Sequence, residues 1–192
     1  MRELSLHIMD VVENGVAAGA TLIGLSLQED SSENWLRITI TDNGRGMNDE
    51  VLKKALDPFF TTRTTRRVGL GLSLIREASK RCDGEFHIQS REGKGTEVTV
   101  SFRLDHIDLA PLGDMASSLT SLIMGNSTVD FVYTHSVDGK VFELDTRQIK
   151  EELDEVPINH PEVIKYLGST IRDSLSDMYT QKTEKHSESI DP

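Results

Sequence analysis

Apolar residues recur along the first 104 residues with two different periods. Spacings of three and four residues predict helices, and strict alternation of apolar and polar residues predicts strands. The elements expected in this part are, in order, a helix over 3–20, a hairpin of strands at 23–27 and 36–40, a short helix after Asn48, a helix over 70–81, and a second hairpin with strands at 85–90 and 96–104. This order predicts an α+β fold, a two-layer sandwich in which a mostly antiparallel sheet has helices on one face.

The pattern changes after residue 104. We expect a helix over 114–124, strands over 129–134 and 141–144 on either side of an Asp138-Gly139 turn, and helices over 146–153 and 161–179. Residues 180–192 contain almost no apolar side chains and are expected to be disordered. The sequence therefore predicts a domain over 1–104, a small α/β unit over 105–179 and a tail over 180–192.

Charge separates the two parts of the chain more sharply than hydropathy does. Residues 1–104 carry 14 basic and 15 acidic side chains, whereas residues 105–192 carry 7 basic and 17 acidic ones. An acidic surface repels phosphates, which disfavours nucleic acid as a partner and favours contact with another protein. The single cysteine, the absence of a signal-peptide pattern and the absence of a long apolar run predict a cytoplasmic protein without a membrane span.

Four short motifs carry candidate chemistry. Asp42 ends a strand with the parity of buried residues and is followed by glycines, so it could accept a hydrogen bond from a ligand that packs closely on the backbone. Asp10 and Asn14 share one face of the first helix, where an amide oxygen can bind a hard cation. Pro58 to Arg63 form an aromatic and threonine-rich segment, and glycines at 69 and 71 open a helix in the way that suits phosphate binding. Each motif alone also fits an ordinary turn, loop anchor or solvated helix face.

Together, in this order, the motifs resemble the ATP-binding domain of the GHKL superfamily, which comprises gyrase, chaperone, histidine kinase and MutL-type ATPases. Residues 10–21 resemble the N box, residues 42–47 the first glycine box, residues 58–63 the F box and residues 69–72 the second glycine box. Residues 84–102 are similar to the last hairpin of the kinase domains. The resemblance spans nearly all of residues 1–104 and implies a Bergerat-type fold that binds ATP with Mg²⁺.

The resemblance also implies a role for each matching residue. Asn14 would bind Mg²⁺, and Asp10 or Glu13 would act as the catalytic base. The expected ATP-binding residues are Asn14, Asp42, Gly44, Gly46, Met47, Phe59, Thr61, Thr62, Arg63, Gly69, Leu70, Gly71, Leu72 and Thr96. Residues 61–68 would form a short, basic lid over ATP.

One departure from the family pattern bears on catalysis. The ATPase branches and the anti-sigma-factor kinases have a glutamate four residues before the Mg²⁺ asparagine, whereas this chain has the shorter Asp10. In-line phosphoryl transfer is sensitive to such placement, so slow turnover is expected. The main hypothesis is a regulatory protein kinase or ATP-dependent switch that acts on a protein partner. The alternatives are a non-catalytic ATP-sensing module, or an ATP hydrolase of the clamp type, and a homodimer is compatible with each of them.

Overall fold

The computed structural model describes residues 3–56 and 71–188, and the side chains up to residue 180. The predictions for residues 57–70, which include the F box, the whole lid and the start of the second glycine box, lie outside the described residues. Residues 3–56 lie before this gap, and residues 71–188 follow it.

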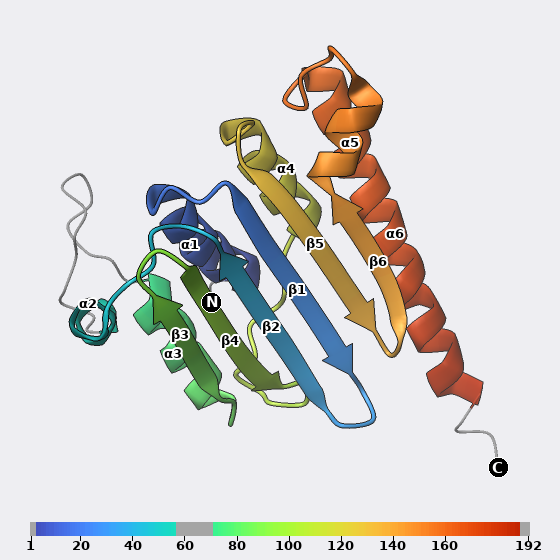
Figure 1. Ribbon diagram of the computed structural model, residues 1–192. Coiled ribbons are helices and arrows are strands. Elements are labelled where there is room, and N and C mark those ends of the chain that lie inside the picture. The colour runs from blue at the N-terminus through green and yellow to red at the C-terminus, as the bar shows by residue number, and fades with distance from the viewer. Residues whose placement is uncertain (1–2, 57–70, 189–192) are drawn as a thin grey trace.

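One mixed sheet of six strands organises the molecule (Figure 1). Its order is β3-β4-β2-β1-β5-β6, and every neighbouring pair is antiparallel except β1 and β5, which are parallel. The strands are β1 (Leu22–Asp30), β2 (Trp35–Asp42), β3 (Phe86–Arg91), β4 (Gly95–Arg103), β5 (Asp130–Val137) and β6 (Lys140–Asp145). Both hairpins predicted in the first 104 residues are present, and β4 of the second pairs with β2 of the first.

Helices cover one face of this sheet. The described helices are α1 (Leu4–Ala17), α2 (Asp49–Ala55), α3 (Gly71–Arg81), α4 (Met115–Gly125), α5 (Thr146–Leu153) and α6 (Pro161–Glu188). In Figure 1, α1, α3, α4 and α6 all lie behind the strands. The fold class is therefore confirmed: an α+β sandwich with a mostly antiparallel sheet and its helices on one side.

Side-chain alternation along the strands separates a buried face from an open one. Leu27, Ile38, Val100 and Tyr133 are fully buried under the helices. The other face carries polar side chains such as Thr39, whose hydroxyl lies 3.3 Å from that of its cross-strand neighbour Thr99. The hydrophobic core thus lies between the sheet and α1, α3, α4 and α6.

The segments after residue 104 are built onto the first part of the chain. Strand β5 pairs over its whole length with residues 22–29 of β1. The segment before α4 returns to α1, where the carbonyls of Pro111 and Leu112 accept hydrogen bonds from the first N–H groups of α1. These carbonyl contacts satisfy donors that a helix otherwise leaves to its cap or to water. A domain boundary at residue 104 stays a prediction, but strands from both sides of it belong to one sheet. Helix α6 ends at Glu188, later than the Tyr179 expected from the sequence, and it includes residues expected to be disordered.

A buried polar cluster joins α6 to the sheet. The carboxylate of Glu29 accepts a hydrogen bond from the Tyr179 hydroxyl of α6 and lies 3.2 Å from His135 Nε2. The other ring nitrogen, Nδ1, is 2.7 Å from the Tyr133 hydroxyl. Because a carboxylate only accepts, the pattern is satisfied when Nε2 carries the ring proton and Nδ1 accepts from Tyr133. We call this set of four side chains the Glu29 cluster.

Candidate nucleotide-binding site

Asp42 lies at the end of β2, directly against α1. A β-carbon added to Gly15 of α1 would lie 2.9 Å from Asp42 Cβ, so only glycine lets the helix approach this closely. The Gly44 N–H donates a hydrogen bond of 2.8 Å to Asp42 Oδ1. Burial raises the pKa of Asp42, and hydrogen bonds from the Gly44 and Thr96 backbone partly oppose this rise. The Asp42 carboxylate is therefore partly buried and fixed in direction at the end of β2. Its parity with the buried residues of this strand predicted the burial.

The loop from Asp42 to Met47 is held by its neighbours on both sides. The side-chain oxygen of Asn43 accepts hydrogen bonds from the Thr21 and Leu22 N–H groups, at 2.8 and 3.0 Å. Gly46 has a φ of +63°, and a β-carbon there would lie 2.0 Å from the Arg91 carbonyl oxygen. Gly46 was expected to admit a flat ligand, and the structure adds that its first contact is the β3–β4 hairpin. Contacts with β1 and with the β3–β4 hairpin thus hold the loop in place.

Helix α1 connects this carboxylate to the start of α3. A β-carbon added to Gly71, the first residue of α3, would lie 3.0 Å from Asp10 Cβ. Gly15 and Asp10 are about 7.5 Å apart along the axis of α1, at 1.5 Å per residue. Asn14 lies between them in the sequence and is half-buried. The two motifs predicted from the sequence to hold opposite ends of a ligand therefore meet the same helix.

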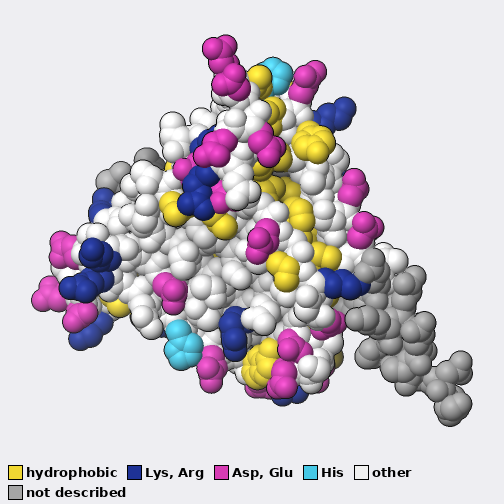
Figure 2. Space-filling view, turned by 45° about the vertical axis from the view of Figure 1, so that its right-hand side comes forward, with side chains coloured by type: hydrophobic (Ala, Val, Ile, Leu, Met, Phe, Trp, Pro, Cys, Tyr) yellow, Lys and Arg dark blue, Asp and Glu magenta, His cyan; other side chains and the backbone are white. Residues whose placement is uncertain are grey.

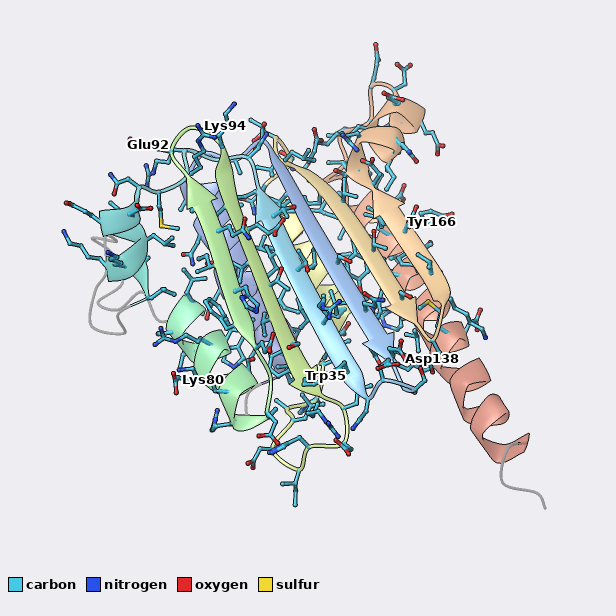
Figure 3. All side chains as sticks on the ribbon, turned by 60° about the horizontal axis from the view of Figure 1, so that its bottom comes forward. Trp35, Lys80, Glu92, Lys94, Asp138 and Tyr166 are labelled. Atoms are coloured by element: carbon cyan, nitrogen blue, oxygen red, sulfur yellow. The ribbon has the colours of Figure 1, made fainter. Side chains whose placement is uncertain are left out.

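A cavity of about 340 Å³ opens at the end of the sheet beside Asp42. Its lining comes from β2, β3, β4 and the turn between β3 and β4, and includes Asp42, Ser90 and Thr96. Glu92 and Lys94 mark this turn in Figure 3, whereas Trp35 lies at the opposite end of the sheet. The volume falls in the range of small-molecule sites. Asn14 and Asp10 are not among the lining residues, so the cavity corresponds to one end of the predicted site.

Two residues at this end were missed by sequence reasoning. The Ser90 hydroxyl accepts a hydrogen bond of 2.9 Å from the Met47 N–H and lies 2.9 Å from Thr96 Oγ1. Gly95 has a φ of +95°, and a β-carbon there would lie 1.8 Å from the Asp42 carbonyl oxygen. A run of Gly and Thr after a hairpin turn was the available signal for Gly95. Ser90 gave none, since a serine in a strand is an ordinary polar residue.

Six of the predicted ATP-binding residues lie outside the described part of the chain: Phe59, Thr61, Thr62, Arg63, Gly69 and Leu70. Gly71 and Leu72 are described, and both are buried at the start of α3. Asp10, Glu13 and Asn14 are half-buried on α1. Gly44 and Thr96 lie beside Asp42, and Gly46 and Met47 contact the β3–β4 hairpin. Every described member of the predicted set is therefore on α1, at the start of α3 or around the end of β2.

The donor set fits Mg²⁺ bound through a nucleotide rather than by the protein alone. Within residues 3–56 and 71–180, no group of three or more His, Cys, Asp or Glu side chains could hold a metal ion. Mg²⁺ commonly takes one or two protein oxygens and completes its shell with water and substrate phosphates. The amide oxygen of Asn14, beside the Asp10 carboxylate of the previous turn, is a suitable protein ligand of this kind.

Comparison with known proteins agrees with this geometry. Residues 2–106 match the model of the histidine kinase-, DNA gyrase B- and HSP90-like ATPases. The chain belongs to this family. Members of the GHKL superfamily bind ATP, and the N-terminal part of this chain is accordingly an ATP-binding domain of the histidine kinase-, DNA gyrase B- and HSP90-like type.

Curated relatives of this GHKL chain include sensor kinases. It is 36% identical over 109 residues to a putative sensor protein of Shewanella frigidimarina, and the aligned region covers 56% of this chain and 17% of the relative. It is 34% identical over 105 residues to the sensor protein kinase FleS of Pseudomonas aeruginosa, covering 55% and 25%. The chain thus spans a quarter or less of the length of these relatives.

A solved structure supports the fold assignment of the GHKL domain. The MutL ATPase domain of Aquifex aeolicus, complexed with ADP, is similar with a TM-score of 0.50 and 18% identity, over 77% of this chain and 65% of that one. The aligned share exceeds what residues 2–106 alone can supply, so part of the sheet and helices after residue 106 also has a counterpart there. Among the described residues, none of the helices is long and apolar enough to cross a membrane.

Proposed function

We propose that this GHKL protein binds Mg-ATP between α1 and the β3–β4 hairpin and acts as a protein kinase or an ATP-dependent switch on a protein partner. The observation that carries the proposal is the placement of α1, which packs Gly15 on Asp42 and Asp10 on Gly71. An ATP molecule whose adenine amino group donates to Asp42 then has Asn14 and α3 on the side of its phosphates.

Each group of the chain has a separate task in this proposal. Asp42 accepts from the adenine amino group, Asn14 offers its amide oxygen to Mg²⁺, and the first N–H groups of α3 face phosphate oxygens. When bound, Mg²⁺ would neutralise phosphate charge. The Asp10 carboxylate, on the part of α1 that packs against Gly71, takes the proton of the attacking hydroxyl or water, with Glu13 as the alternative base.

The kinase alternative is favoured by the relatives, and the acidic second part of the chain supplies a surface for a partner. Acidic side chains gather at the end of the molecule that is formed by α5 and the segment after it, at the top of Figure 2. The exposed acids there are Glu151, Glu152, Asp154 and Glu155. Such a surface attracts a partner with a basic patch and speeds their encounter at low salt.

Calorimetry with Asp42→Asn tests the nucleotide site. The amide keeps an oxygen for the Gly44 N–H but turns a donor toward the adenine amino group, so we expect ATP affinity to fall by about tenfold or more. The control is Asp49→Asn, an exposed acid in the first turn of α2. Unchanged affinity in Asp42→Asn would show that the nucleotide lies elsewhere.

Transfer of ³²P from γ-labelled ATP separates the kinase from the passive switch. The wild-type chain is incubated with the proteins that co-purify with it, and both protein-bound and free phosphate are measured. We expect protein labelling that Asp10→Asn abolishes while ATP binding persists. Labelling that survives in Asp10→Asn but not in Glu13→Gln assigns the base to Glu13. ATP binding without any protein labelling or release of phosphate would exclude the kinase and favour the ATP-dependent switch.

A further inference from the structure

Three polar side chains form a row across three strands at the cavity beside Asp42. Ser90 of β3 is the register partner of Thr96 on β4, and Thr96 is the register partner of Asp42 on β2. All three line the cavity. Because side chains at paired positions point to the same face, the row presents hydroxyl, hydroxyl and carboxylate groups side by side.

The hydrogen atoms in this row are constrained by what the neighbours can donate. The Met47 N–H donates to Ser90 Oγ, which leaves this hydroxyl with one lone pair and its single hydrogen. That hydrogen can go to the Gly95 carbonyl, 3.1 Å away, or to Thr96 Oγ1, 2.9 Å away. In the first arrangement Thr96 donates to Ser90 and shows only lone pairs to the cavity. In the second arrangement Thr96 accepts from Ser90 and is free to donate.

A purine distinguishes these two arrangements at adjacent positions of its edge. A 6-aminopurine offers a donor at its amino group and an acceptor at N1, whereas a 6-oxopurine offers an acceptor and then a donor. Asp42 can only accept, which suits the amino group. A direct hydrogen bond from Thr96 to N1 requires Thr96 in its donating arrangement.

We infer that Ser90 is a specificity-determining residue of the nucleotide site. It donates its hydrogen to Thr96 when the ligand is a 6-aminopurine, and so lets Thr96 donate toward N1. The hydrogen bond that it accepts from the Met47 N–H also ties the loop from Asp42 to Met47 to β3. The inference rests on the proposed function, because it takes the base to lie beside Asp42. It assigns base selectivity to a residue whose hydroxyl acts through Thr96.

The experiment compares ATP with inosine triphosphate, which differs from it only in the amino and N1 positions of the base. Affinities of the full chain for both nucleotides are measured by calorimetry for wild type, Ser90→Ala and Ser90→Thr. We expect wild type to prefer ATP, Ser90→Ala to lose about fivefold to tenfold of that preference, and Ser90→Thr, which keeps the hydroxyl, to retain most of it.

Ser101→Ala is the matched control, since Ser101 is a β4 serine whose hydroxyl also accepts from a backbone N–H, that of Glu85, away from the cavity. It should leave the ATP preference unchanged at a similar cost in stability. Equal weakening of both nucleotides in Ser90→Ala would overturn the inference and leave Ser90 a structural residue. A wild-type chain that binds neither nucleotide would instead remove the proposed function and this role together.

Discussion

Removal of one hydroxyl from the Glu29 cluster should destabilise the protein measurably. In Tyr179→Phe the ring keeps its place on α6, but the buried Glu29 carboxylate loses a donor. Hydrogen bonds to charged groups contribute about 1.5–3 kcal/mol, so we expect a loss of about 2 kcal/mol. For a chain of this size that corresponds to a Tm lower by about 4–8 °C. His135 Nε2 remains near the same carboxylate, which keeps the loss from being larger.

Urea denaturation, followed by far-UV circular dichroism, measures this change. Tyr166→Phe is the control, because Tyr166 is on the same helix and 69% exposed, and it points outward in Figure 3. Its free energy of unfolding should stay within about 0.5 kcal/mol of wild type. If Tyr179→Phe behaves like this control, the cluster does not hold α6 on the sheet.

The same cluster predicts a loss of stability at alkaline pH. Burial, and then the bond to Glu29, raise the pKa of Tyr179 in the folded state. A tyrosine in the unfolded chain has a pKa of about 10. Above that pH the folded state therefore retains a proton that the unfolded state releases. The stabilisation is complete below about pH 10 and decreases as pH rises further. The difference between wild type and Tyr179→Phe should therefore shrink above that pH, and a difference that grows would contradict the mechanism.

Three further substitutions test other parts of the structure. Gly15→Ala should weaken ATP binding by about tenfold in calorimetry, because the added β-carbon would lie 2.9 Å from Asp42 Cβ and displace that side chain. Unchanged affinity would mean that α1 moves away instead and leaves Asp42 in place. Gly95→Ala should lower the free energy of unfolding by about 3 kcal/mol or more in urea, since it combines positive φ with a contact of 1.8 Å to backbone; a near-neutral result would refute the close approach. Asp114→Ala should cost about 1 kcal/mol at pH 7 by removing the cap of α4. Bonds from Ser117 lower the pKa of Asp114, so this cost should decrease as pH falls below the unfolded-chain pKa of about 3.9, and a constant cost would exclude the carboxylate cap.

Local patterns gave the sequence its predictive power here. The starts of the helices after Asn48 and Asp114 and both N-terminal hairpins follow from neighbouring residues. Each of them is present in the structure. The parallel pairing of β1 with β5 could not be predicted, because nothing in either strand specifies a partner so distant in sequence. For the same reason the Glu29 cluster was not predicted, since its members come from β1, β5 and α6.

The candidate site shows the same division. The sequence predicted Asp42 and the helix carrying Asn14 as parts of the site, because their spacing belongs to an ordered set of motifs. Ser90 and Gly95 were not found, because their importance comes from contacts with Met47 and with the Asp42 carbonyl across the sheet. Residues whose role is to position others leave little trace in a single sequence.

The parallel pairing of β1 with β5 has a consequence for how the chain folds. Strands β1 to β4 can form two hairpins and pair with one another early, but β1 then has an open edge until residue 137 has been made. Pairing across so long a stretch of sequence closes slowly. During synthesis the ATP-binding half is therefore expected to wait, with one strand edge open to other chains, for the segment that completes its sheet.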